Sequence, residues 1–150
     1  MATHSLASSP DQGDSPAAAA TGAVKWLLRA EGALVLALAT LAYHRLGGGW
    51  ALFALLFLAP DLTMLGYLID PRWGARVYNF GHTYLTPTIL AVAGYALATP
   101  ALYGIALIWI AHIGTDRLLG FGLKYPTGFG ATHLGSNGRD QSAFFAVSSR

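Results

Sequence analysis

Apolar residues occur along this chain in blocks long enough to cross a membrane as helices, a crossing that takes about 20 mostly apolar residues. Two such blocks flank a glycine-rich turn, and a third, 77–115, contains no Asp, Glu, Lys or Arg and is too long for one span. Because the residue before a proline is disfavoured in a helix, Pro100 divides this third block in two. The four predicted spans are 26–43, 50–69, 78–98 and 101–119.

Prolines predict further local features within this pattern. Pro60 should bend the second span, since a proline inside a helix leaves a backbone carbonyl without its partner. Segment 70–74, DPRWG, has the residue types of a turn, and the last two spans should form a hairpin with almost no loop. We therefore predict an all-α membrane protein, with a four-helix transmembrane bundle over 25–119.

The two ends of the chain differ in composition from the spans. Segment 1–24 is rich in Ala, Ser, Gly, Pro and Asp and has no aromatic residue, which predicts a disordered tail. It also lacks the basic start and apolar run of a signal peptide. Segment 120–150 combines many glycines with aromatic residues, so we expect a tail at the membrane interface that folds back over the mouth of the bundle.

Composition supports the membrane prediction and excludes several functions. Hydrophobic residues make up 54% of the chain and charged residues only 11%, against about 25% charged residues in soluble domains. The chain has no cysteine, which excludes disulfides, thiolate metal sites and thiol nucleophiles. A net charge of +2 is too small to indicate binding to nucleic acid.

The basic residues predict the orientation of the bundle. With four spans, both tails and the 70–77 loop share one side of the membrane. All nine Lys and Arg residues except Arg45 would lie on that side. Because Lys and Arg accumulate on the cytoplasmic side, we expect both termini in the cytoplasm.

Six polar residues lie inside the predicted spans, although a charged side chain at mid-bilayer costs about 2.5–3.5 kcal/mol on insertion scales. With alternating helix directions they fall in the cytoplasmic halves of all four spans; at 1.5 Å per residue Asp61 lies about 12 Å and His112 about 10 Å from that end. Pairs three or four residues apart share a helix face. The six residues are Glu31, Asp61, Asn79, His82, His112 and Asp116.

Imidazoles and carboxylates that meet inside a helical bundle are typical of metal centres. We expect His82 and His112 to be metal ligands, with Asp61, Asp116 and Glu31 completing the coordination. The absence of thiolates favours zinc, manganese or iron over copper(I). Such an ion would activate water, so a hydrolase-like enzyme acting on a lipid or amphiphile is the first hypothesis.

Basic and polar residues near this layer are candidates for supporting roles. Arg117 and Lys124 would meet an anionic headgroup at the interface, and the folded-back tail would bring Lys124 and His133 towards the cluster. Asn79 shares a helix face with His82 and would support it.

Purely structural interpretations of the same residues stay open. Glu31 could pair with Arg29 or Lys25 at the interface. Asp61 could cap the backbone freed by Pro60, or pair with His82 or His112. His112 and Asp116 could simply bond to each other while Arg117 extends to the headgroups. A polar network that only specifies helix pairing would have much the same sequence pattern.

Three sequence strings resemble one known family. The strings are LGGGWALFALLFLAPDLTMLGYL, YNFGHTYLTP and WIAHIGTDRLLGFGLKYPTGFGATHLG. They are similar to the bacterial membrane family catalogued as domain of unknown function 4260, and the resemblance covers about 31–135. The resemblance implies a small multi-span protein of the bacterial inner membrane. It implies no activity, cofactor or site residue.

Other functional classes remain open alternatives to the metal-dependent enzyme. His82 and His112 could be axial ligands of a haem in an electron carrier. Glu31, Asp61 and the histidines could form a proton relay in a transport subunit, which would need a homo-oligomer because four helices are few. A structural membrane subunit without chemistry is the fourth alternative.

Overall fold

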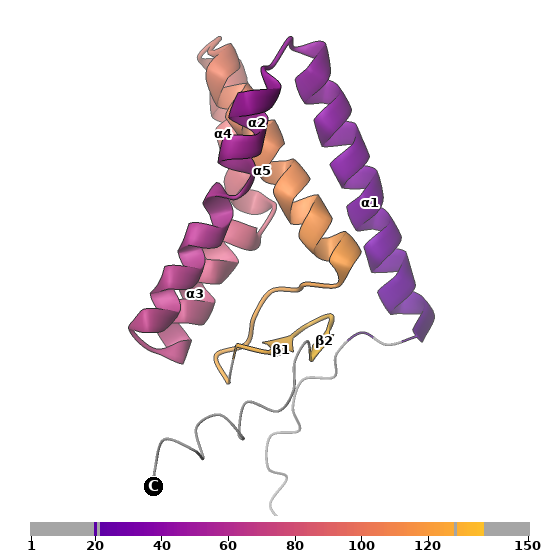
Figure 1. Cartoon of the computed structure of the whole chain (residues 1–150), viewed down its shortest axis with the longest axis vertical. Coiled ribbons are helices and arrows are strands. Elements are labelled where there is room, and N and C mark those ends of the chain that lie inside the picture. The colour runs from indigo at the N-terminus through magenta and orange to yellow at the C-terminus, as the bar shows by residue number, and fades with distance from the viewer. Residues whose placement is uncertain (1–19, 21, 128, 137–150) are drawn as a thin grey trace, which may run out of the picture.

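The helices of this protein form a bundle with one small hairpin beneath it (Figure 1). The computed structural model describes residue 20, residues 22–127 and residues 129–136. The helices are α1 (Gly22–Arg45), α2 (Trp50–Phe57), the 3₁₀ helix η1 (Ala59–Leu68), α3 (Pro71–His82), α4 (Leu85–Ala96) and α5 (Pro100–Leu119). Strands β1 (Ala131–Thr132) and β2 (Gly135–Ser136) pair antiparallel.

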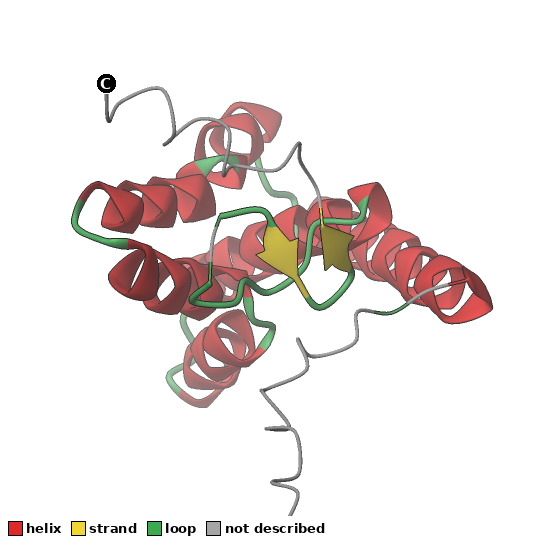
Figure 2. Ribbon diagram, turned by 90° about the horizontal axis from the view of Figure 1, so that it is seen from below, coloured by secondary structure: helices red, strands yellow, loops and turns green. Residues whose placement is uncertain are grey.

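The chain runs up and down the bundle in turn (Figure 1). Helix α1 rises, α2 and η1 descend, α3 and α4 rise, and α5 descends again. The β1–β2 hairpin lies across the lower end of the helices, as the view from below shows (Figure 2). We call this lower end, where both described ends of the chain lie, the hairpin end; there Ala20 N–H donates to His133 O at 2.9 Å.

Three helical stretches are long and apolar enough to cross a membrane: Gly22–Arg45, Trp50–Leu68 and Pro100–Leu119. Leu85–Ala96 is a shorter apolar helix. Large apolar side chains face outward on these elements, including Leu55, Leu68 and Tyr95. A surface of this kind is stable against lipid and not against water, so the chain has the character of a multi-pass membrane protein.

The prediction of one helix over 78–98 is wrong. Helix α3 ends at His82, Thr83 is extended, and α4 begins at Leu85. The cause is Pro87, which has no N–H to donate to the carbonyl of Thr83 and whose ring would collide with it in a continuous helix. A new helix that begins at Leu85 places Pro87 in its first turn, where no such bond is required.

The predicted turn over 70–74 is also wrong, because the helix already begins at Pro71. The Asp70 carboxylate accepts hydrogen bonds from the backbone N–H groups of Arg72 (2.7 Å) and Trp73 (2.9 Å). Asp70 is therefore the N-cap and Pro71 the first residue of α3. The same two residue types are also common in turns, which explains the wrong prediction.

The second predicted span, 50–69, contains two kinds of helix. The α-helical part ends at Phe57 and a 3₁₀ helix continues from Ala59, with the buried Pro60 in its first turn. Asp61 N–H donates to Leu58 O at 3.2 Å, and the Thr63 hydroxyl donates to Pro60 O at 2.6 Å. Pro60 thus changes the helix type where a bend was predicted, and a 3₁₀ run of this length is uncommon.

Two glycine contacts set the distances between helices. A Cβ on Gly114 of α5 would lie 2.8 Å from Leu36 N and 2.9 Å from Gly32 O of α1, so no larger side chain fits at this crossing. A Cβ on Gly81 of α3 would lie 2.6 Å from a methyl carbon of Thr63 in η1. Small residues at helix crossings let backbones approach closely in membrane proteins.

Candidate metal centre

Four ionisable side chains from three helical elements meet inside the bundle. Asp61 comes from the first turn of η1, and His82 is the last residue of α3. His112 and Asp116 lie one turn apart on α5, so both project from the same face of that helix. We call these four residues the His/Asp cluster.

Each aspartate places one carboxylate oxygen within 4 Å of both histidine Nε2 atoms. His82 Nε2 and His112 Nε2 are 3.3 Å apart. Asp61 Oδ1 lies 3.5 Å from His82 Nε2 and 3.7 Å from His112 Nε2. Asp116 Oδ2 lies 3.4 Å and 3.7 Å from the same two nitrogens. The ligand atoms of Asp61, His82 and His112 all lie within 4.8 Å of one another, close enough for these three side chains to hold one metal ion.

The distances of 3.3–3.7 Å among Asp61, His82 and His112 match three ligands of one small cation. Ligands about 2.0–2.2 Å from one ion lie about 3.3–3.6 Å from one another, because a tetrahedron's edge is about 1.63 times its centre-to-vertex distance. A hydrogen bond between an imidazolium and a carboxylate would instead be about 2.7–2.9 Å long. The distances therefore fit three ligands around a cation, with Asp116 beside the two histidines, better than a network of direct hydrogen bonds.

Neighbouring groups orient the His82 imidazole. Its Nδ1 lies 2.9 Å from the carbonyl of Tyr78, one turn earlier, and only an N–H at Nδ1 can donate there. The neutral ring then carries a lone pair on Nε2, which faces the cluster. The Tyr78 ring stacks on the imidazole with centroids 3.8 Å apart. Fixing one nitrogen through a backbone carbonyl is how proteins prepare the other for a metal.

The break after α3 gives the cluster a further connection to α5. Because the helix ends at His82, the carbonyl of this residue is free of helical bonding, and Arg117 Nη2 donates to it at 2.8 Å. Arg117 Nη1 also donates to Phe121 O at 2.7 Å. The guanidinium thus connects α3, α5 and the segment after α5.

The cluster is buried on its histidine side and accessible on its aspartate side. His82 is 0% exposed, whereas the Asp61 side chain is 41% and that of Asp116 14% exposed. A pocket of ≈ 300 Å³ lies against the two carboxylates. Its other lining residues are Met64, Tyr78, Phe121, Gly122, Lys124, Phe129 and Thr132. A small ligand in this pocket, which we call the hairpin-end pocket, would lie beside the cluster.

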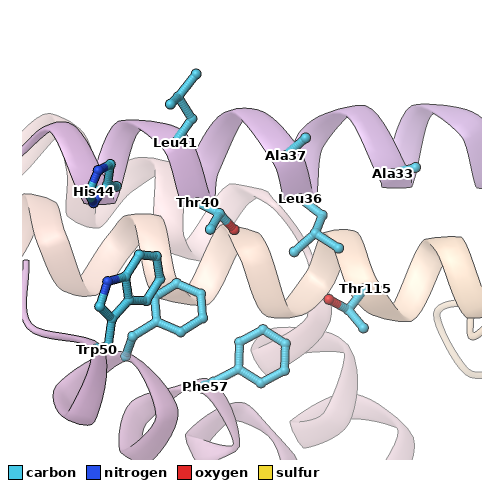
Figure 3. Close-up of a pocket in the computed structure, with 10 residues that line it drawn as sticks. Ala33, Leu36, Ala37, Thr40, Leu41, His44, Trp50, Phe57 and Thr115 are labelled. Atoms are coloured by element: carbon cyan, nitrogen blue, oxygen red, sulfur yellow. The ribbon is translucent and has the colours of Figure 1, made fainter.

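A second, larger hollow is the groove between α1 and the helices that face it (Figure 3). It measures ≈ 790 Å³ and is lined mainly by apolar side chains, with Ala33 and Ala37 of α1 leaving room along one wall. Phe57 and Thr115 line the groove near the cluster, and the Phe57 ring packs edge-on against His112 with centroids 5.3 Å apart. Phe57 therefore contacts both the groove and the cluster.

Of the predicted ligands, the structure brings four together and leaves one apart. The cluster contains Asp61, His82, His112 and Asp116. Glu31 is exposed on α1. No ion pair within 4 Å joins Glu31 to Arg29 or Lys25 in the described part of the chain, so its predicted interfacial pairing is not seen either.

The predicted supporting residues have more specific places than expected. The Asn79 side-chain amide donates to Lys124 O (2.9 Å) and accepts from Lys124 N–H (2.7 Å), which fastens the segment after α5 to α3. Arg117 is buried between two carbonyls and does not extend towards headgroups. His133 lies in the hairpin, where its Nδ1 accepts from Leu123 N–H at 2.9 Å, and burial lowers its pKa.

The sequence interpretation missed residues that hold the histidines. Tyr78 precedes His82 by four residues, a spacing that places both on one helix face and could have been read from the sequence. Two more such residues come from the second span. Phe57 packs against His112, and the Thr63 hydroxyl lies 3.5 Å from His82 Nδ1. Their contacts depend on tertiary packing, for which the sequence pattern gave no signal.

Comparison with known proteins gives one match. A family model described as domain of unknown function (DUF4260) matches residues 25–136, which include every residue of the cluster and both hollows beside it. No curated protein and no solved structure matched the chain.

Proposed function

We propose that this chain, which belongs to the family described as domain of unknown function (DUF4260), binds one divalent metal ion inside the membrane and is a hydrolase acting on a lipid or another amphiphile. The observation that carries the proposal is the spacing of 3.3–3.7 Å among the ligand atoms of Asp61, His82 and His112, with Asp116 Oδ2 within 4 Å of both histidine nitrogens. Two imidazoles and two carboxylates suit zinc, manganese or iron.

The accessible side of the cluster supports catalysis over a purely structural ion. Structural zinc sites are closed by four protein ligands, whereas catalytic sites leave room for water or substrate and can expand to five ligands. Here the hairpin-end pocket borders both carboxylates, so a water or substrate oxygen has space beside the cluster. A bound ion would polarise the substrate and lower the pKa of water, and the carboxylate not engaged by the ion would take the proton that water loses.

The haem alternative fits the geometry poorly. Two axial nitrogens on opposite faces of one iron would be about 4 Å apart, twice a metal–nitrogen bond of about 2.0 Å. His82 Nε2 and His112 Nε2 are 3.3 Å apart. Asp61 and Asp116 also lie 3.4–3.7 Å from these nitrogens, in the space that a porphyrin would fill.

The membrane topology is part of the same proposal. We infer four crossings, by α1, by α2 with η1, by α3 with α4, and by α5, with both termini on the cytoplasmic side of a bacterial inner membrane. The bias of basic residues towards the hairpin end supports this orientation. The groove along α1 would then open to lipid chains, which supports an amphiphilic substrate.

Metal analysis of the purified protein tests the proposal. Protein exchanged into metal-free buffer and reloaded should hold about one ion per chain, and His82→Ala and His112→Ala should lose most of it, since each removes one ligand. His44→Ala is the matched control, because His44 lines the groove on α1 and is not in the cluster. A folded wild type that holds no divalent metal would contradict the proposal.

A further inference from the structure

We propose that the hairpin-end pocket binds a phosphate group of the substrate, with the ammonium of Lys124 and the metal ion on opposite sides of that group. This inference rests on the proposed function for the ion and adds the chemical class of the ligand. The pocket brings Lys124 and the carboxylates of Asp61 and Asp116 into one lining of ≈ 300 Å³.

Lys124 is held in a defined place by its backbone and its side chain. The Asn79 amide makes two hydrogen bonds to the Lys124 backbone, and the Lys124 side chain is directed back between aromatic rings. Its Nζ lies 3.2 Å from the centroid of the Phe129 ring and 4.6 Å from that of Tyr78, and it donates to Phe129 O at 2.9 Å. A lysine fixed in this way can present its charge to a ligand without first being ordered.

The Lys124 ammonium has ring and carbonyl contacts but no directly paired carboxylate among the described residues. Lys124 is only 9% exposed, yet no carboxylate of the described residues lies within 4 Å of its Nζ. Three N–H donors are available and one has a carbonyl acceptor. Burying a cation without a counter-ion is unfavourable, and an anion in the pocket would supply the missing partner.

The other basic residue near the cluster is already engaged. Arg117 donates to the carbonyls of His82 and Phe121, and it does not line the pocket. The Thr132 hydroxyl lines the pocket but donates to Gly135 O at 2.6 Å. Lys124 is therefore the cation of this pocket among the described residues.

A phosphate suits this arrangement because its several anionic oxygens point in different directions. One oxygen can face a metal ion while another accepts from an ammonium, a pairing that recurs in phosphate sites. A free phosphate compound and the headgroup of a phospholipid offer the same chemistry, so the experiment must separate these two sources.

Isothermal titration of inorganic phosphate into metal-loaded protein in detergent tests the inference. We expect binding by the wild type, at least tenfold weaker binding by Lys124→Met, and partial recovery in Lys124→Arg, which keeps the charge. Lys25→Met is the matched control, since Lys25 is the other lysine of the chain and does not line the pocket. Equal affinity in the wild type and Lys124→Met would overturn the inference, as would an equal loss in Lys25→Met.

A second arm of the experiment identifies the source of the phosphate group. The same titration in nanodiscs of phosphatidylcholine alone, and in nanodiscs that also contain phosphatidic acid, shows whether an anionic headgroup competes with inorganic phosphate. Competition supports a lipid headgroup, and its absence supports a free phosphate compound.

Metal content measured on the same samples separates the two proposals. Loaded protein that binds phosphate in neither arm refutes this inference and leaves the metal centre standing. Protein without metal whose phosphate binding still requires Lys124 refutes the metal centre and supports the pocket.

Discussion

The two halves of the His/Asp cluster are carried by opposite kinds of backbone. His112 and Asp116 lie on α5, a regular α-helix of 20 residues that packs along α1. Asp61 lies in a 3₁₀ helix that follows a proline, and His82 lies at the last residue of a helix that stops inside the bundle. The regular half places its two side chains by helical spacing alone, whereas the irregular half needs specific tertiary contacts to hold each residue.

This difference assigns separate tasks to the contacts around the cluster. The close crossing of Gly32 and Gly114 fixes the height and rotation of α5 against α1. In the irregular half, Gly81 against Thr63 brings α3 next to η1, and Arg117 bonds the end of α3 to α5. Changes on the two sides should therefore affect folding and metal binding in different proportions.

The largest expected effect comes from Gly114→Ala in the regular half. Its new methyl group would lie under 3 Å from the backbone of α1, so the helices must separate, and we expect the free energy of unfolding to fall by about 3 kcal/mol. Gly104→Ala on the same helix meets only Tyr43 ring atoms at 3.7 Å or more and should be neutral or stabilising by up to about 1 kcal/mol. Unfolding followed by helical circular dichroism measures both; similar losses in the two variants would show that the crossing is not what positions α5.

Arg117→Met should have the next largest effect, because it cuts the connection between the halves. The substitution removes the buried guanidinium and its hydrogen bonds to two backbone carbonyls. We expect the free energy of unfolding to fall by about 2 kcal/mol. Metal affinity should also fall, although Arg117 is not a ligand, because the end of α3 that carries His82 loses its anchor. Arg29→Met is a matched control. Arg29, near the start of α1, also donates to a backbone carbonyl of α5, that of Leu118, but within the described part of the chain it makes no bond to the end of α3. Unchanged metal affinity in Arg117→Met would argue against this connection.

The smallest predicted effect is the pH dependence of stability that Lys124 causes. The backbone of Lys124 is bonded to Asn79 of α3, in the irregular half. Burial lowers the pKa of this ammonium to about 8, from an ordinary 10.5. Between those values the unfolded chain holds more protons than the folded chain, so stability should rise with pH in this window. Without added phosphate we expect the wild type to gain about 2–4 °C in Tm relative to Lys124→Met between pH 8 and 10. Parallel curves for the two proteins would contradict the burial of the charge.

Much of the fold follows from hydrophobic pattern, and the exceptions have local causes. The range predicted for the last span, 101–119, differs from α5 by one residue at its start, because that helix is continuous and regular. The third span was predicted as one helix because hydropathy does not register Pro87. Asp70-Pro71 was assigned to a turn because one aspartate–proline pair serves both turns and helix starts.

The site was predictable to the extent that helix geometry determines it. His112 with Asp116 follows from a spacing of four, and matched depth brought Asp61 and His82 to the same level. The depth of a residue in the membrane does not tell which side of its helix faces the bundle, however. For that reason Glu31 was predicted to join the cluster although it is exposed on α1. The bonds of Asn79 and Arg117 to distant backbone groups depend on tertiary contacts that no local pattern contains.

The visible absorption spectrum of the cobalt-substituted protein tests the central claim most directly. Cobalt(II) gives intense visible bands in a tetrahedral site and weak bands when six-coordinate. The account predicts the intense tetrahedral type at one equivalent of cobalt, its loss in His82→Ala and His112→Ala, and its retention in His44→Ala. A weak six-coordinate spectrum, or one that is unchanged in both histidine variants, would contradict a metal centre built from the His/Asp cluster.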